Sequence, residues 1–281
     1  MIGVTDPFTD IRTYADAQLI DRLLDVTRSF KSALVCGAET SHLAQDLLKK
    51  HNLDTVFEGE FSDPDGPANG AVSKVNNRII YDDEWVPFKN EIFDLVISMR
   101  ALHWVNDLPG ALIQLRRCLE PDGLFLASLY GGQTLHELRE SLIEAETQLR
   151  GGIAPRVSPF VDVRDAGNLL VRAGFALPVA DSDTVAREYI SLPELFDDLK
   201  NMGETNAVRE RPHGLATARL FEIAEQIYKE RHSTKTGHLK ATFEIITLTG
   251  WSPSESQQKP LAPGSAKQRL SDALDTEEKL F

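Results

Sequence analysis

Carboxylates and a glycine stand at the ends of short apolar runs in the first third of the chain. Gly37, Glu60 and the neighbouring pair Asp82 and Asp83 each end or follow such a run. If these runs are parallel strands, their carboxyl ends meet at one edge of a sheet, which is where open α/β sheets bind ligands. Carboxylates there accept hydrogen bonds from hydroxyl and amino groups. The spacing therefore predicts a polar-ligand site at this edge.

A second group of residues is predicted to face a substrate. His103 and Tyr130 follow two further apolar runs, and Met202, Glu204 and Asn206 lie in a glycine-containing segment between two helical ones. Loops held over a rigid scaffold commonly carry substrate choice. We therefore expect this segment to form part of a lid over the cleft. The alternatives are structural, namely a helix-entry histidine beside a packed tryptophan and a simple helix-ending turn.

Patterns for other chemistries are missing from the sequence. None of the seven histidines is followed two residues later by an acid, as the usual non-haem iron ligand pair requires. The segment His136–Glu140 has glutamate where a zinc protease has its second histidine. No Gly-x-Ser-x-Gly elbow and no Walker loop occurs. We predict no metal site.

The elements that position these residues are clearest in the middle of the chain. The apolar run 92–98 is typical of a strand buried on both faces. Leu108–Leu119 has apolar residues at helical spacing, 121–123 predicts a turn, and 124–129 predicts a second buried strand. Strand, helix and strand in this order predict a right-handed parallel crossover.

Composition limits the class of protein. The 281 residues include 30 Lys and Arg against 43 Asp and Glu, a formal charge of −13, which argues against nucleic acid as a partner. Two cysteines make no disulfide framework and suit a reducing compartment. No apolar run approaches the length of a membrane span, and residues 1–10 lack a secretory signal pattern. We expect a cytoplasmic protein without an integral membrane segment.

The strings Leu102-His-Trp-Val-Asn-Asp and Leu119-Glu-Pro-Asp-Gly-Leu-Phe resemble strands four and five of the class I methyltransferase fold, which binds S-adenosylmethionine (SAM). The resemblance implies that Glu60 binds the ribose hydroxyls and that Asp82 or Asp83 binds the adenine amino group. It assigns Gly37, Glu39 and Ser98 to the same cofactor site. The first loop departs from the family pattern, because Val35 replaces the expected acid and Glu39 and Ser41 replace expected glycines.

The implied fold is a seven-stranded, mainly parallel Rossmann-like α/β sheet with helices on both faces. Residues 1–30 are expected to be a helical lead-in, 31–250 the methyltransferase-like domain with a helical lid insertion at 191–231, and 251–281 a polar, partly disordered tail. The run 239–248 should be the last strand, antiparallel and next to 124–129. Residues 175–189 should contain one or two strands.

Longer strings resemble one subgroup, the bacterial relatives of the mitochondrial respiratory complex I assembly factor with a methyltransferase fold. A more distant resemblance is to the malonyl-carrier-protein methyltransferase of biotin synthesis. The strings that carry the resemblance are Asp107–Leu112, Gly131–Arg139, Gly151–Phe160, Val163–Gly167, Arg172–Asp181, Met202–Ala207, Ala241–Ile246 and Gly250–Pro260.

The resemblance implies a SAM-dependent enzyme that acts on a protein or carrier-bound substrate, with a respiratory complex I subunit as a candidate partner. Methyl transfer needs alignment of donor and acceptor more than a catalytic triad. Two alternatives stay open. One is an assembly chaperone that kept the fold and lost SAM. The other is arginine hydroxylation, the activity implied by the mitochondrial relative.

Overall fold

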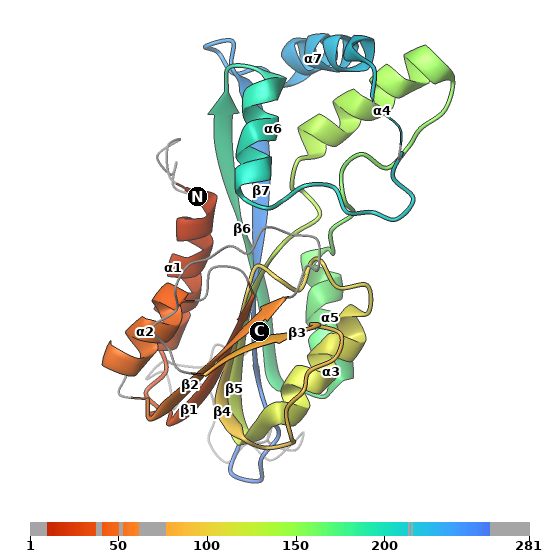
Figure 1. Ribbon diagram of the computed structural model, residues 1–281. Helices are drawn as coiled ribbons and strands as arrows, with labels where there is room; N and C mark the ends of the chain where they lie inside the picture. Colours follow the sequence, from red (N-terminus) through yellow and green to blue (C-terminus); the bar gives the residue numbers. More distant parts are fainter. Residues whose placement is uncertain are drawn as a thin grey trace, which may run out of the picture.

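The computed structural model describes residues 10–37, 41–50, 53–61, 77–212, 214 and 216–258. Their strands form one seven-stranded sheet in the order β3-β2-β1-β4-β5-β7-β6 (Figure 1). The strands are β1 (Ser32–Gly37), β2 (Thr55–Phe61), β3 (Arg78–Tyr81), β4 (Phe93–Met99), β5 (Leu119–Tyr130), β6 (Ala176–Tyr189) and β7 (Leu239–Trp251).

The direction of each strand follows the class I methyltransferase arrangement. The five strands from β3 to β5 pair in parallel, and β7 runs antiparallel to both β5 and β6. Leu124 of β5 pairs with Trp251 and Tyr130 pairs with Ile245. The prediction that the last strand lies antiparallel beside 124–129 is confirmed. The fold class is confirmed with it.

Helices cover both faces of the sheet (Figure 1). Side chains of α1 and α2 join one hydrophobic core with β1, β2, β4 and β5, while α3 and α5 join a second core with the same sheet. Their apolar faces, spaced three and four residues apart, supply the buried leucines and alanines. These helices are α1 (Ile11–Leu24), α2 (Ser41–Lys50), α3 (Leu108–Cys118) and α5 (Val163–Ala173).

A third core lies beyond the parallel strands and forms what we call the cavity lobe. It contains α4 (His136–Arg150), α6 (Leu192–Asn201), α7 (Ala218–His232), the second half of β6 and the first half of β7. The strand β7 pairs with β6 from Leu239 to Trp251 but with β5 only from Ile245. The pair β6–β7 therefore extends past the sheet and carries the helices of this lobe (Figure 1).

The structure corrects one local expectation and decides between the alternatives left open for another. The predicted turn at 121–123 lies inside β5, where Asp122 has a φ of 65° and the register with β4 shifts between Phe93 and Leu95. Ser252 exchanges backbone hydrogen bonds with Asp122 and Gly123, so the irregularity stays paired as a bulge. Of the one or two strands predicted in 175–189, the structure has one long strand, β6. Most of the predicted tail, 259–281, lies outside the described residues.

Candidate functional site

The carboxyl ends of the first four strands bring the predicted cofactor residues to one edge. Gly37 of β1 is in register with Met99, the residue after Ser98 in β4. On the other side of β1, Glu60 of β2 is in register with Ile80 of β3, two residues before Asp82. Four of the predicted positions therefore share the edge at which α/β sheets bind ligands.

Gly37 is required by the backbone at this edge. It has a φ of +115°, and a Cβ atom built on it would lie 2.0 Å from the carbonyl oxygen of Met99. Only glycine combines that conformation with so close an approach. The next three residues, including Glu39, lie outside the described part of the chain, as does the side chain of Glu60. Their predicted roles remain predictions.

Asp82 and Asp83 have different surroundings. Asp82 is exposed, and one of its carboxylate oxygens accepts a hydrogen bond from the backbone N–H of Glu84 at 2.9 Å. Asp83 is only 8% exposed, and burial, with the nearby charge of Asp82, raises its pKa to about 6. The neighbouring Tyr81 side chain acts in the opposite direction and lowers this pKa. Of the two residues, Asp82 presents its carboxylate to solvent and suits an adenine amino group better.

Ser98 lies beside a buried thiol rather than at an open surface. Its side chain is fully buried, and its hydroxyl has no hydrogen-bond partner by distance and angle in the described part of the chain. Ser98 is in register with Cys36, whose pKa burial raises to about 12. The Cys36 thiol is therefore protonated at neutral pH and is no nucleophile.

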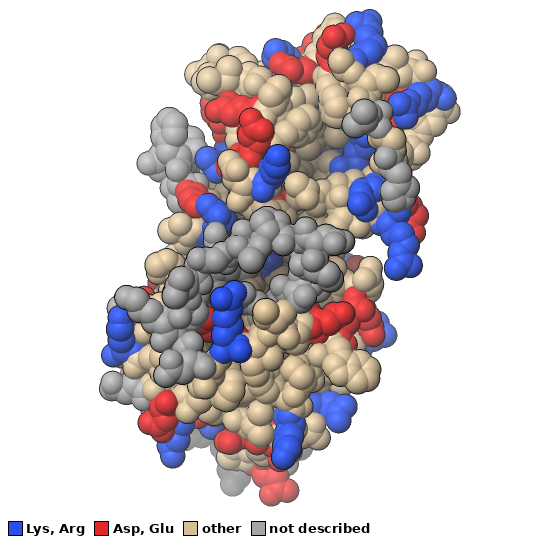
Figure 2. Space-filling model, viewed as in Figure 1, with Lys and Arg blue, Asp and Glu red and all other residues tan. Residues whose placement is uncertain are grey.

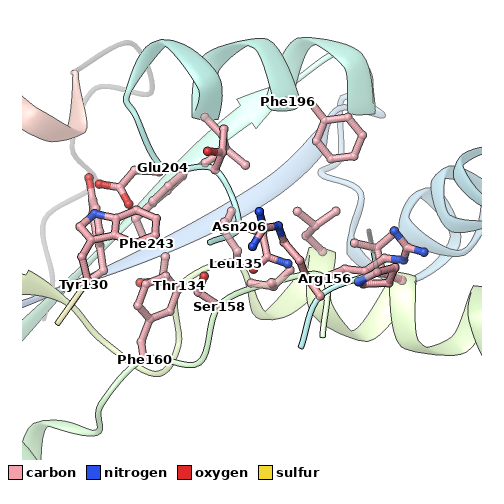
Figure 3. Close-up of a pocket in the computed structure, with 18 of the residues that line it drawn as sticks. Tyr130, Thr134, Leu135, Arg156, Ser158, Phe160, Phe196, Glu204, Asn206 and Phe243 are labelled. Atoms are coloured by element: carbon pink, nitrogen blue, oxygen red, sulfur yellow. The ribbon is translucent and has the colours of Figure 1, made fainter. Parts of the chain in front are cut away.

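A cavity of about 350 Å³ opens beside this edge, within the cavity lobe (Figure 3). Its walls are mainly leucine and phenylalanine side chains from α4, α6, α7 and β7, with Trp104 after β4 and Tyr130 at the end of β5. The polar side chains that line it are Thr134, Arg156, Ser158, Glu204, Thr205, Asn206 and Arg211. An apolar cavity with a few polar groups is typical of a small-molecule or side-chain site.

The structure brings His103 and Glu204 together although 101 residues separate them. Nε2 of His103 lies 3.1 Å from a carboxylate oxygen of Glu204. The histidine side chain is 1% exposed and packs against the rings of Trp104, Tyr130 and Phe160 at centroid distances of 5.2, 5.0 and 5.9 Å. The histidine therefore lies behind the cavity wall and holds the Glu204 carboxylate in it.

Glu204 is aimed at the cavity by the turn that ends α6. Gly203 has a φ of +79°, and the backbone N–H of Glu204 donates to the carbonyl of Leu199 at 2.8 Å, a Schellman-type helix end. The helix-ending turn and the cavity-facing segment, set out above as alternatives, are thus one structure. Met202 packs against the third core and does not line the cavity.

Asn206 lines the cavity but its amide serves the backbone. Its Nδ2 donates to the carbonyl of Pro155 at 2.8 Å, and its Oδ1 accepts from the N–H of Val208 at 3.0 Å. The side chain therefore joins the loop after α6 to the loop after α4. This is a structural role that the sequence pattern does not indicate.

The sequence reasoning missed Arg156 and its partner. Nε of Arg156 lies 2.7 Å from a carboxylate oxygen of Glu146, which is 1% exposed on α4. Glu146 also accepts the backbone N–H of Ala154 at 2.7 Å. The sequence around Arg156 has neither a helix nor a strand pattern. The available signal for this pair is Glu146, a charged residue at a position that faces inward in α4.

The order and direction of the strands agree with a family-level match. A profile described as a methyltransferase domain matches residues 9–178. The chain belongs to this methyltransferase family. Its fold is also that of a solved structure, the YcgJ protein of Bacillus subtilis, with a TM-score of 0.56 and 15% identity over 85% of this chain and 99% of that one.

Curated members of the family cover nearly the whole chain. It is 40% identical over 263 residues to "Arginine-hydroxylase NDUFAF5, mitochondrial" of Danio rerio, 93% of this chain and 81% of that protein. It is 37% identical to the Homo sapiens protein of the same name, over 92% of this chain and 74% of that protein. It is 34% identical to the malonyl-[acyl-carrier protein] O-methyltransferase of Methylovorus sp., over 96% of this chain and 93% of that protein.

Two further findings concern the described residues alone. No helix among them has the length and apolar character needed to cross a bilayer. No group of three or more His, Cys, Asp or Glu side chains in those ranges is arranged to hold a metal ion.

Proposed function

We propose that this family member is a SAM-dependent methyltransferase-like enzyme that acts on a group carried by a protein or a carrier. The observation that supports this proposal is the position of the cavity. Trp104 and Tyr130, which line it, follow or end β4 and β5 at the edge where this fold binds its cofactor. A group held in the cavity would lie next to a donor held at the edge.

The residues at the edge fit such a cofactor. Asp82 presents an exposed carboxylate, Glu60 ends the neighbouring strand, and the Ser98 hydroxyl is a buried polar group without a partner in the described ranges. In the proposal Glu60 and Asp82 hold the nucleoside, while Gly37 and Ser98 lie at the methionine end. When bound, SAM supplies a methyl group on a sulfonium. The protein aligns the acceptor and excludes water.

The acceptor is proposed from the relatives and from the cavity. The relatives' names give an arginine side chain for one group and a malonyl-carrier protein for the other. Glu204, set among the aromatic rings of Trp104 and Tyr130, favours a cationic side chain such as arginine. Together with the resemblance of the whole chain, this favours a protein substrate, with a respiratory complex I subunit as the candidate.

Calorimetry with SAM and with its demethylated product tests the proposal. We expect both to bind. Glu60→Ala should weaken SAM binding about tenfold or more, because two ribose hydroxyls lose their acceptor. Glu120→Ala is the matched control, since this exposed acid lies near the opposite end of the parallel strands. If neither compound binds the wild-type protein, the enzyme assignment fails and the assembly-chaperone alternative replaces it.

A further inference from the structure

The cavity carries opposite charges at separate positions. Figure 3 shows Glu204 beside Tyr130, and Arg156 on the other side of Leu135 and Asn206. The walls are mainly apolar, so charges there interact more strongly with a ligand than they would in water. A ligand that fills the cavity meets both a carboxylate and a guanidinium.

The carboxylate position is held in place from behind. The Glu204 side chain is 11% exposed, and the buried imidazole of His103 binds one of its oxygens. Trp104 and Tyr130 also line the cavity, and Figure 3 shows Tyr130 beside Glu204. A carboxylate beside aromatic rings is a surrounding that stabilises a cation and disfavours an anion.

The guanidinium position retains an unused donor. Glu146 accepts from Nε of Arg156 and from the N–H of Ala154. Nη2 of Arg156 is buried and has no hydrogen-bond partner in the described part of the chain. Arg211 lines the same cavity, and Figure 2 shows several Lys and Arg side chains to the right of a hollow in the upper half of the molecule, with Asp and Glu side chains at its upper left. A buried guanidinium donor left without a partner is costly unless a ligand supplies an acceptor.

We propose that the substrate is a polypeptide segment with two charges, a basic side chain that pairs with Glu204 and an acidic side chain that pairs with Arg156 and Arg211. The inference rests on the proposed function only in taking this cavity as the substrate site. Alternate residues of an extended chain share one face. A basic and an acidic residue separated by one position can therefore enter the cavity together.

Four blocked tripeptides test the two charges separately. They are acetyl-X-Ala-Z-amides in which X is arginine or glutamine and Z is glutamate or glutamine, titrated into the full chain and followed by NMR or calorimetry. The peptide with both charges should bind more tightly than either singly charged peptide, by about tenfold or more, because each of those lacks one charge-assisted hydrogen bond.

Variants assign each charge to its residue. Glu204→Gln should abolish the preference for arginine over glutamine and leave the preference for glutamate. Arg211→Gln should weaken the preference for glutamate alone, and Arg211→Glu should reverse it. Arg219→Gln and Glu222→Gln, on the exposed surface of α7, are the matched controls and should change neither preference. Arg156→Lys keeps a charge beside Glu146, so it should fold and retain part of the preference for glutamate.

Equal affinity for all four peptides would overturn the proposal. So would a preference for arginine that survives Glu204→Gln together with a preference for glutamate that survives Arg211→Gln unchanged. Preference for the acidic peptide alone would replace it with a simple anion site. The result is independent of cofactor binding, which the SAM titration measures. Charge-selective peptide binding without SAM binding would leave this inference standing and defeat the proposed function, and the reverse outcome would do the opposite.

Discussion

Asp83 shows how far a single side chain can differ from its neighbour. Its carboxyl is buried beside Tyr81, and burial raises its pKa to about 6, whereas Asp82 lies in solvent. The ordinary pKa of an aspartate is 3.8. At pH values between 3.8 and about 6, the folded protein therefore keeps a proton on Asp83 that the unfolded chain has released. Asp83 therefore lowers the free energy of unfolding as pH rises through this window.

Asp83→Asn should remove that pH-dependent loss. The gain in unfolding free energy of the variant over wild type should be larger at pH 7.5 than at pH 4. The difference should reach up to about 3 kcal/mol, because two pKa units correspond to about that energy. Melting temperatures of both proteins at the two pH values measure the difference. Asp165→Asn, in an exposed first turn of α5, is the control. A difference that does not vary with pH would mean that Asp83 does not titrate in this range.

Gly37 gives a second prediction at the residue scale. Gly37→Ala places a Cβ against the Met99 carbonyl at a positive φ, so it should cost about 3 kcal/mol or more of unfolding free energy. Gly152→Ala is the matched control, since nothing lies within 4 Å of its Cβ position. Urea unfolding of both variants gives the comparison. Equal small losses would contradict the close approach of β1 and β4.

At the scale of elements, the loop after α6 combines two roles. Glu204 belongs to the cavity, while Asn206 joins this loop to the one that contains Pro155. The sequence pattern predicts both residues to be substrate contacts. A glycine-interrupted segment indicates that a loop is present, but not which of its side chains bond to a backbone far away in the chain.

Asn206→Ala should therefore reduce stability as well as function. Two hydrogen bonds to backbone groups are lost, so we expect a loss of about 1–2 kcal/mol in unfolding free energy. Thr205→Ala, next to it on the cavity wall, should change stability little. Thermal unfolding monitored by circular dichroism distinguishes the two variants. An Asn206→Ala protein as stable as wild type would return this residue to the substrate contacts.

Sequence patterns predicted the elements better than the contacts between them. Apolar runs such as 93–99 are buried on both faces and have one interpretation, so the order of strands and the shared edge followed. The Pro-Asp-Gly signal was real locally, as the φ of Asp122 shows, but pairing with Ser252 kept it within β5. Glu146 lies at helical spacing from Leu138 and Leu142, so its inward position follows from the pattern of α4. Its partner Arg156 lies in an irregular segment, and no sequence pattern indicates that the two side chains meet.

For the whole molecule, local stability should differ between the sheet and the cavity loop. Residues 203–212 contain mostly exposed or half-buried residues, whereas β5 is almost wholly buried. Native-state hydrogen exchange should therefore be fastest in 203–212 and should slow there when a tripeptide with both charges binds. Amides of α5, none of whose residues lines the cavity, are the internal control. Exchange in 203–212 as slow as in β5 would contradict a movable lid.

The strand β7 has a further mechanical consequence. It bonds to β6 throughout its length and to β5 from Ile245 onward, so the sheet and the cavity lobe share one continuous ladder. Rotation of one lobe against the other would break hydrogen bonds of that ladder. A hinge motion between the lobes is therefore not expected to be the conformational change of lowest free energy. Displacement of the loop after α6 is therefore the motion that we expect to change access to the cavity. The two lobes should melt together, in one cooperative transition, despite their separate cores.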